Sequence, residues 1–333
     1  MRYLLNNSTD PYFNMALDEF CLENIVLDEP YFYLWRNRPS VIIGLNQNAY
    51  SEVNLKYLEE NGILLVRRVT GGGAVYHDLQ NLNYTIVSPL PCHPERSEGS
   101  EGRSEGSTPT SIVTALRLLG VPAELTGRND IFVEGRKVSG YARRVSGKQE
   151  IIHGTLMYDV DLETLTNVLD TPGSKLQAKG IGSVKSRVAN LKDYLPGFRS
   201  LDEVQNELQR LLAGADGQME LTEDQLSEVR KMADEKFSTW DFIYGRSRQA
   251  DLVRKAKLPC GTVEASISLD RGIITGISFS GDFLFDEPAA ELESRLTGLR
   301  FDRGVLAGVL DDAAVSRCFR DSDSSDVLDL LFL

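Results

Sequence analysis

The stretch that most constrains the fold lies between residues 64 and 87 and reads LLVRRVTGGGAVYHDLQNLNYTIV. Apolar, β-forming runs stand on either side of two arginines and three consecutive glycines. Glycine has no Cβ atom, so a ligand can approach the backbone closely, and successive N–H groups can point at an anion. The side chains of Arg67 and Arg68 carry donor pairs that match phosphate oxygens. The stretch therefore predicts a strand, an anion-binding loop and a second strand.

An alternative for the same stretch is that Gly71, Gly72 and Gly73 form only a flexible hairpin. The glycines belong to neither common nucleotide-binding motif. No Gly-Lys-Ser or Gly-Lys-Thr follows them, and the G-x-G-x-x-G spacing is absent. Both interpretations stay open from the loop alone.

The length and charge of the chain limit its class. Its 333 residues are enough for one large domain and one small one. The formal net charge of −13 argues against a nucleic-acid-binding surface, although it allows a local basic pocket for phosphate. No apolar run approaches the roughly 18 residues that span a bilayer, and the N-terminus lacks the apolar core of a signal peptide. We therefore expect a cytoplasmic protein that binds neither nucleic acid nor membrane.

The spacing of apolar and turn-forming residues predicts the remaining elements. Strands are expected at residues 3–5, 31–35, 41–44 and 151–160, with a hairpin that turns at Glu134 and Gly135. Helices are expected at residues 14–27, 55–61, 112–119, 161–169, 201–212 and 223–237. The polar, repetitive segment 91–109 cannot bury a core, so we expect a mobile surface loop there. Trp35 is expected in the core, or beside a ligand pocket.

The pattern starts afresh beyond Gly245. The run GTVEASISLDRGIITGISF alternates apolar and polar residues around a hairpin signal at 270–272, and helices are expected at 288–299 and 313–319. We therefore divide the chain into a large domain at 1–245 and a small α+β domain at 246–333.

Four motifs then occur in order: RRVTGGGAVYHD, TGRNDIFVEGRKVSG, HGTL and KGIGSVKSRVANL. Together they resemble the lipoate–protein ligase family of the biotin/lipoate ligase superfamily. The resemblance implies an α/β (α+β) large catalytic domain with mixed sheets, followed by a small α+β C-terminal accessory domain. It also implies a two-step reaction. Lipoate and ATP form lipoyl-AMP and pyrophosphate, and the lipoyl group then passes to an acceptor lysine.

The same resemblance implies a set of site residues, with Lys137 as the catalytic residue. The implied ATP-binding residues are Arg68, Gly72, Gly73, Ala74, Val75, Tyr76, Asn129, Asp130 and Lys137. The implied lipoate-binding residues are Trp35, Arg67, Gly72, His77, Lys137, Gly140 and His153. The implied metal is Mg²⁺, with Asp130 as its ligand. A carboxylate that attacks the α-phosphate builds charge on phosphate oxygens, which Lys137 and Mg²⁺ would offset.

The implied partners are the lipoyl domains of 2-oxoacid dehydrogenases and the glycine-cleavage H protein. Such domains are commonly acidic around the acceptor lysine. The basic side chains of Lys179, Lys185 and Arg187 are therefore a candidate contact.

Two rival activities belong to the same superfamily or derive from it. One is an octanoyl or lipoyl transferase that uses an acyl-cysteine and no ATP. Between Cys92 and Cys260 the chain has no cysteine, which argues against this rival. The other is a relative that binds lipoyl groups without catalysis. Biotin ligation fits the Gly-Gly-Gly-Ala-Val-Tyr-His run less well. The scattered cysteines also argue against a zinc site or a disulfide scaffold.

Overall fold

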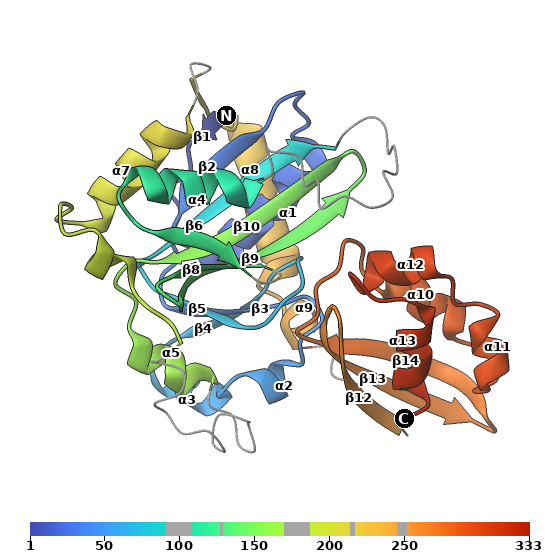
Figure 1. The fold of residues 1–333 in the computed structure, drawn as a ribbon. Coiled ribbons are helices and arrows are strands. Elements are labelled where there is room, and N and C mark those ends of the chain that lie inside the picture. Colours follow the sequence, from blue (N-terminus) through green and yellow to red (C-terminus); the bar gives the residue numbers. More distant parts are fainter. Residues whose placement is uncertain (91–107, 127–128, 170–186, 214–216, 245–251) are drawn as a thin grey trace.

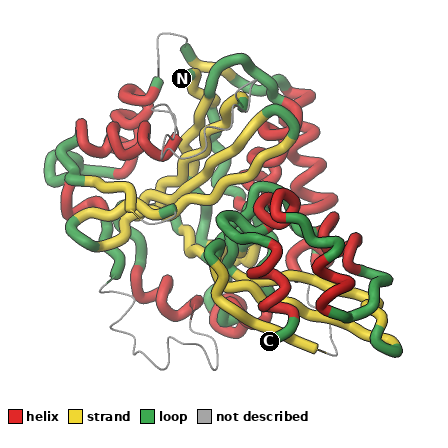
Figure 2. Tube along the Cα trace, turned by 45° about the vertical axis from the view of Figure 1, so that its right-hand side comes forward, coloured by secondary structure: helices red, strands yellow, loops and turns green. Residues whose placement is uncertain are grey.

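The computed structural model describes residues 1–90, 108–126, 129–169, 187–213, 217–244 and 252–333. Within these ranges the chain forms a large part with two mixed sheets and a smaller part with a sheet of its own (Figures 1 and 2). Most of the segment predicted as a mobile loop lies outside the described residues, as does the predicted boundary at 245. None of the described helices is long and apolar enough to cross a membrane.

The main sheet has eight strands, of which only the pairs at the β1 end are parallel. In spatial order they are β11 (Gln218–Met219), β1 (Arg2–Leu4), β2 (Tyr31–Trp35), β6 (Asn81–Pro89), β10 (Gln149–Met157), β9 (Arg136–Ser146), β8 (Asp130–Val133) and β7 (Ala123–Thr126). Glu134 and Gly135 both have positive φ, and they form the β8–β9 turn that the sequence predicts.

Helices cover both faces of this sheet. Phe32 and Leu34 of β2 face a core shared with α4 (Thr108–Leu118) and α7 (Leu201–Leu212). Tyr31, Tyr33 and Trp35 face the opposite side, where α1 (Pro11–Asn24) and α8 (Glu223–Met232) pack. Successive strand residues point to opposite faces, so a strand covered on both sides is apolar throughout.

Helix α1 begins earlier than the apolar periodicity suggests. The side chain of Asp10 accepts a hydrogen bond from the N–H of Tyr12 and caps the helix, and Pro11 occupies its first turn. Proline is favoured there because its missing N–H would have no partner within the helix. Asp-Pro pairs often begin turns, but here the pair marks the start of the helix.

The second sheet explains the path of the glycine stretch. Its order is β4 (Leu64–Arg67), β3 (Ser40–Ile43), β5 (Val75–His77), with β3 parallel to β4 and antiparallel to β5. The glycine loop thus crosses over β3, and the flexible-hairpin alternative is wrong because β4 and β5 do not pair. Short helices α2 (Ala49–Glu52), α3 (Leu55–Glu60) and α5 (Leu162–Leu169) lie on this side of the large part, as Figure 1 shows.

The remaining elements connect and complete the molecule. They are η1 (Leu191–Tyr194), the π-helical turn η2 (Ala233–Phe237), α9 (Trp240–Tyr244), β12 (Leu252–Leu258), β13 (Gly261–Asp270), β14 (Ile273–Gly281), α10 (Ala290–Leu296), α11 (Arg303–Ala307), α12 (Asp312–Cys318) and α13 (Ser324–Leu331). The last seven build the antiparallel sheet and helices of the smaller part around a separate core. Positive φ at Arg271 and Gly272 confirms the predicted hairpin. The α+β class with mixed sheets is likewise confirmed.

Candidate functional site

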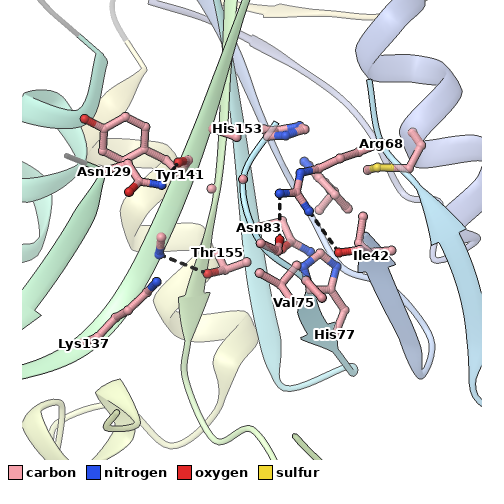
Figure 3. Close-up of a pocket in the computed structure, with 18 residues that line it drawn as sticks. Ile42, Arg68, Val75, His77, Asn83, Asn129, Lys137, Tyr141, His153 and Thr155 are labelled. Atoms are coloured by element: carbon pink, nitrogen blue, oxygen red, sulfur yellow. Dashed lines mark hydrogen bonds between the residues drawn. The ribbon is translucent and has the colours of Figure 1, made fainter. Parts of the chain in front are cut away.

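A cavity lies where the α1 face of the main sheet meets the second sheet. It encloses about 590 Å³ of space, including its open mouth. Its lining residues are Met15, Trp35, Ile42, Arg68, Gly72, Gly73, Ala74, Val75, His77, Asn83, Asn129, Lys137, Gly140, Tyr141, Ala142, His153, Gly154 and Thr155. In Figure 3, Lys137, Asn129 and Tyr141 stand on one side of the cavity, and Arg68, Ile42, Val75 and His77 stand on the other.

Most of the residues that the sequence singles out meet in this cavity. They are Trp35, Arg68, Gly72, Gly73, Ala74, Val75, His77, Asn129, Lys137, Gly140 and His153. The sequence predicts no site role for the other lining residues, among them Asn83 and Thr155. Strand alternation could have found these two, because Asn83 pairs with both Trp35 and Thr155 across neighbouring strands.

Three predicted lipoate or ATP contacts are not lining residues: Asp130 pairs with the lining residue Lys137, whereas Arg67 and Tyr76 lie away from the cavity. The guanidinium of Arg67 is fully buried and donates to the carbonyls of Gly44, Leu45, Gln47, Phe242 and Ile243. The structure therefore corrects the expectation that Arg67 contacts lipoate, since its donors bind backbone carbonyls. Tyr76 sits between two lining residues of β5, so its side chain points the other way, into the core beside α3 and α5.

Arg68 lines the cavity, but its donors are directed at the loop itself. It donates to the carbonyls of Gly71, Gly73 and Ile42 and to the hydroxyl of Thr70. Burial lowers the pKa of Arg68 to about 10, so the side chain stays charged at neutral pH. Its first effect is therefore to hold the glycine loop in one conformation.

Lys137 stands at the mouth of the cavity and pairs with Asp130. The Nζ–Oδ1 distance is 2.8 Å, and the side chains are 37% and 28% exposed. A Cβ atom on Gly140 would lie 2.9 Å from Lys137 Nζ, so the lysine needs a glycine at this position. Asn129 donates to the carbonyl of Tyr141 at 2.7 Å, which fixes the end of the β8–β9 pair beside it.

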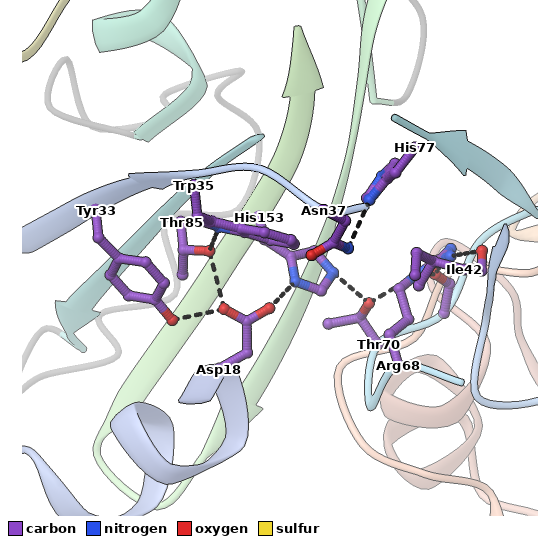
Figure 4. A network of polar contacts seen from close by, with 11 residues as sticks. Asp18, Tyr33, Trp35, Asn37, Ile42, Arg68, Thr70, His77, Thr85 and His153 are labelled. Carbon is purple, nitrogen blue, oxygen red and sulfur yellow. Dashed lines mark hydrogen bonds and ion pairs between the residues drawn. The ribbon is translucent and has the colours of Figure 1, made fainter. Parts of the chain in front are cut away.

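A buried polar network lies beneath the cavity (Figure 4). His153 bonds through Nδ1 to Asp18 at 2.5 Å and through Nε2 to Thr70 Oγ1 at 2.7 Å. The hydroxyls of Tyr33 and Thr85 donate to the same carboxylate of Asp18. Because Thr70 also accepts from Arg68, this network connects α1 to the glycine loop.

Asp130 is the only metal ligand that the sequence predicts. The described residues contain no group of three His, Cys, Asp or Glu side chains that could hold a metal ion. Mg²⁺ is usually held by one or two carboxylates together with substrate phosphates. The carboxylate of Asp130, beside the mouth, fits that kind of site.

Two mixed sheets that enclose a cavity, with a glycine loop on one side and a lysine–aspartate pair on the other, define a protein that binds a small molecule carrying an anionic group. The comparisons are more specific. Residues 10–213 match the lipoyl protein ligase A/B catalytic domain, and residues 247–331 match the bacterial lipoate protein ligase C-terminus. The chain belongs to the lipoate–protein ligase family.

Individual relatives agree with this assignment. The chain is 35% identical to lipoate-protein ligase LplJ of Bacillus subtilis (strain 168), with 98% of both chains covered. A structure of lipoate-protein ligase A bound with ATP has a TM-score of 0.60 and 30% identity, covering 74% of this chain and 99% of that chain. A bi-partite lipoate protein ligase from Thermoplasma acidophilum, described with its E2 lipoyl domain, has a TM-score of 0.64 and 31% identity, covering 75% and 98%.

Proposed function

We propose that this protein is an ATP-dependent lipoate–protein ligase that activates lipoate as lipoyl-AMP and then lipoylates an acceptor lysine. The observation that carries the proposal is the cavity itself. It joins apolar walls to a lysine–aspartate pair and a glycine loop, in a chain of the lipoate–protein ligase family. Apolar walls suit an aliphatic tail, because burying each CH₂ contributes roughly 0.8 kcal/mol.

In the first step, a carboxylate oxygen of lipoate attacks the α-phosphorus of ATP, and the bond to pyrophosphate breaks. Negative charge grows on the phosphate oxygens in the transition state. The ammonium of Lys137 would stabilise that charge, and its present partner Asp130 would take Mg²⁺, which neutralises phosphate charge when bound. The loop amides near Gly73 would hold the nucleotide without a charge of their own.

In the second step, the neutral amine of the acceptor lysine attacks the lipoyl carbonyl, and AMP leaves. A nearby like charge helps by lowering the pKa of that amine, and we propose Lys137 for this role. The proposed acceptors are lipoyl domains of 2-oxoacid dehydrogenases and the glycine-cleavage H protein. The Thermoplasma acidophilum relative, described with its E2 lipoyl domain, supports the first of these.

The acceptor would approach along the basic segment that precedes η1. Lys179 and Lys185 lie outside the described residues, but Arg187 is exposed. Its carbonyl accepts the N–H of Lys137 at 2.8 Å, so Arg187 lies beside the proposed catalytic lysine. We also propose that the two domains are residues 1–245 and 246–333, which is supported by their separate cores, and that the reaction takes place in the cytoplasm.

The transferase rival needs a cysteine nucleophile. Among the described residues no cysteine lines the cavity, and Cys21, Cys260 and Cys318 are all buried. Burial raises the pKa of the Cys21 thiol to about 12, and a thiolate rather than a thiol is the nucleophile. This observation favours the ATP-dependent ligase.

The test is pyrophosphate release from ATP and Mg²⁺, with and without lipoate, in the absence of any acceptor protein. We expect lipoate-dependent release. No release, with acyl transfer from a lipoyl- or octanoyl-protein instead, would assign the chain to the transferases. Inactivity in both assays, with lipoyl-AMP still bound, would favour the non-catalytic relative.

A further inference from the structure

The hydrogen bonds behind the cavity fix the orientation of one asparagine side chain. Asn14 Nδ2 faces the carbonyls of Ser8 and Arg36 at 3.1 and 3.2 Å, so this atom must be the amide nitrogen. It also donates to Asn37 Oδ1 at 2.8 Å. The other end of Asn37 is therefore Nδ2, a donor, and it lies 3.1 Å from Nδ1 of His77.

That contact determines the tautomer of His77. Because Asn37 donates, Nδ1 of the neutral ring must accept, and the ring proton resides on Nε2. Burial, together with the electrostatic effect of nearby Arg68, lowers the pKa of His77 to about 3, so the ring is neutral at physiological pH. His77 is thus held as an Nε2–H donor.

This donor has no acceptor among the described residues. Nε2 of His77 is buried without a hydrogen-bond partner, although the residue lines the cavity. Asn83 shares the property, because its Oδ1 accepts from Asn81 while its buried Nδ2 has no partner. Leaving a buried donor unsatisfied is energetically unfavourable. Two such donors in one cavity indicate a ligand that carries an acceptor.

The surroundings indicate what kind of acceptor that is. Lys137 stands on the opposite side of the cavity (Figure 3), where it suits the carboxylate. Arg68 is charged and lies on the donor side, but its donors bind the carbonyls of Gly71, Gly73 and Ile42 and the hydroxyl of Thr70. Trp35 borders the same side, and its ring lies 5.9 Å from that of His77, edge to face. Once the carboxylate is assigned to Lys137, an uncharged, polarisable acceptor remains for the neutral donors of His77 and Asn83. The sulfur atoms of a dithiolane are weak acceptors and also make favourable contacts with aromatic rings.

We propose that Asn14 and Asn37 hold His77 as the Nε2–H tautomer, and that this donor, with the amide of Asn83, selects a dithiolane-bearing acid over an unsubstituted acid of equal chain length. The inference rests on the proposed function and adds its substrate selectivity. Octanoate has the same carbon chain as lipoate but no sulfur, so it would leave both donors unsatisfied. Asn14 and Asn37 act through His77 and are positioning residues.

The first test compares lipoate with octanoate in pyrophosphate release by the wild-type protein. We expect kcat/KM to favour lipoate by about tenfold or more, which corresponds to roughly 1.4 kcal/mol or more. Equal values for the two acids would overturn the selectivity while leaving the proposed function intact. Release with neither acid would overturn the proposed function instead.

Variants then separate selection from folding. His77→Leu and Asn37→Leu should each reduce the lipoate preference, mainly through a higher KM for lipoate. If the role were merely structural, kcat/KM would fall by the same factor for lipoate and for octanoate, and that result would contradict the proposal. Met15→Leu is the matched control, because it keeps an apolar wall of similar volume. It should change kcat/KM for lipoate and for octanoate by the same factor.

The tautomer itself can be observed without any change in activity. A long-range ¹H–¹⁵N spectrum of the wild-type protein should show a protonated Nε2 and an unprotonated Nδ1 for His77, assigned by loss of the signals in His77→Leu. In Asn37→Leu the signals should shift toward a tautomer mixture. A protonated Nδ1 in the wild type would overturn the positioning role of Asn14 and Asn37.

Discussion

At the scale of single residues, Lys137 depends on a missing Cβ atom. Its ammonium lies where a side chain on Gly140 would be, while it pairs with Asp130. The neighbour that a methyl group would meet is the far end of a flexible side chain. The lysine can therefore move aside at little cost in stability but with loss of its position.

Gly140→Ala should therefore reduce lipoate-dependent pyrophosphate release by about tenfold or more, while the melting temperature changes little. Lys137→Ala should reduce it by about 10²-fold or more, as removal of a transition-state donor commonly does. Steady-state kinetics and thermal melts measure both effects. Lys148→Ala, at an exposed position in the β9–β10 turn, is the control. Full activity in Lys137→Ala would contradict the catalytic role.

Unlike Lys137, Arg67 stabilises the fold, because it donates hydrogen bonds to buried backbone carbonyls. Arg67→Leu leaves several buried carbonyls without a donor, each at a cost of roughly 1–3 kcal/mol. We expect the free energy of unfolding to fall by about 3 kcal/mol or more in urea titrations. Arg38→Leu removes a half-exposed ion pair with Asp10. It should lower the free energy of unfolding by only about 1 kcal/mol or less. A near-wild-type Arg67→Leu would show that these carbonyls find other donors.

The buried ring of His77 gives the stability a pH dependence of known sign. Its pKa is about 3 in the fold and about 6.5 when unfolded. The unfolded chain therefore binds the proton first, and stability is full above about pH 6.5 and falls as the pH decreases toward 3. His77→Gln should reduce this loss by up to about 1.4 kcal/mol per pH unit. Urea midpoints of the wild type and of His77→Gln at pH 7 and pH 5 provide the test. An equal loss of stability in the two proteins would contradict the role of His77.

At the scale of elements, the glycine loop borders the cavity on one side and contacts the smaller part of the molecule on the other. The sequence predicts a loop that binds an anion, yet the N–H of Gly72 donates to the carbonyl of Phe283 at 3.1 Å. A Cβ on Gly71 would lie 2.4 Å from that same carbonyl oxygen and 2.7 Å from the ring of Phe285. The first glycine is thus required by packing against the smaller part.

Gly71→Ala should separate this contact, because a backbone oxygen cannot yield as a side chain can. We expect faster hydrogen exchange at the Gly72 amide and a larger radius of gyration in solution scattering. Gly197→Ala is the control, since nothing lies near a Cβ at that position. Unchanged exchange at Gly72 would mean that the loop has another partner for its N–H.

Local signals explain which elements the sequence predicts well. Helix α7 begins and ends where its apolar spacing predicts, with Ser200 as the N-cap. Strand β2 likewise matches its apolar run. The insertion of β3 between β4 and β5 could not be predicted, because strand pairing is non-local. The position of the Arg67 side chain could not be predicted for the same reason, because its carbonyl partners lie far away in the sequence.

At the scale of the whole molecule, the two parts meet directly beside the cavity. The N–H of Gly281 donates to the carbonyl of Asn46 at 2.9 Å, and Arg143 of β9 pairs with Asp286 at 2.5 Å. Leu45 of the large part is buried in the core of the smaller one. The smaller part therefore supports the glycine loop, and a role as a simple spacer does not account for these contacts.

Removal of residues 246–333 should therefore impair the first chemical step as well as the second. Without Phe283 and Phe285, the loop at Gly71 and Gly72 loses its packing partner and samples other conformations, so nucleotide binding becomes less ordered. We expect lipoate-dependent pyrophosphate release to fall by about tenfold or more, with circular dichroism confirming that the remaining chain is folded. Addition of the separate 246–333 fragment should restore part of the rate if the contact is what matters. A truncated protein that forms lipoyl-AMP at the full rate would instead make the smaller part a spacer for this step and confine its contribution to transfer.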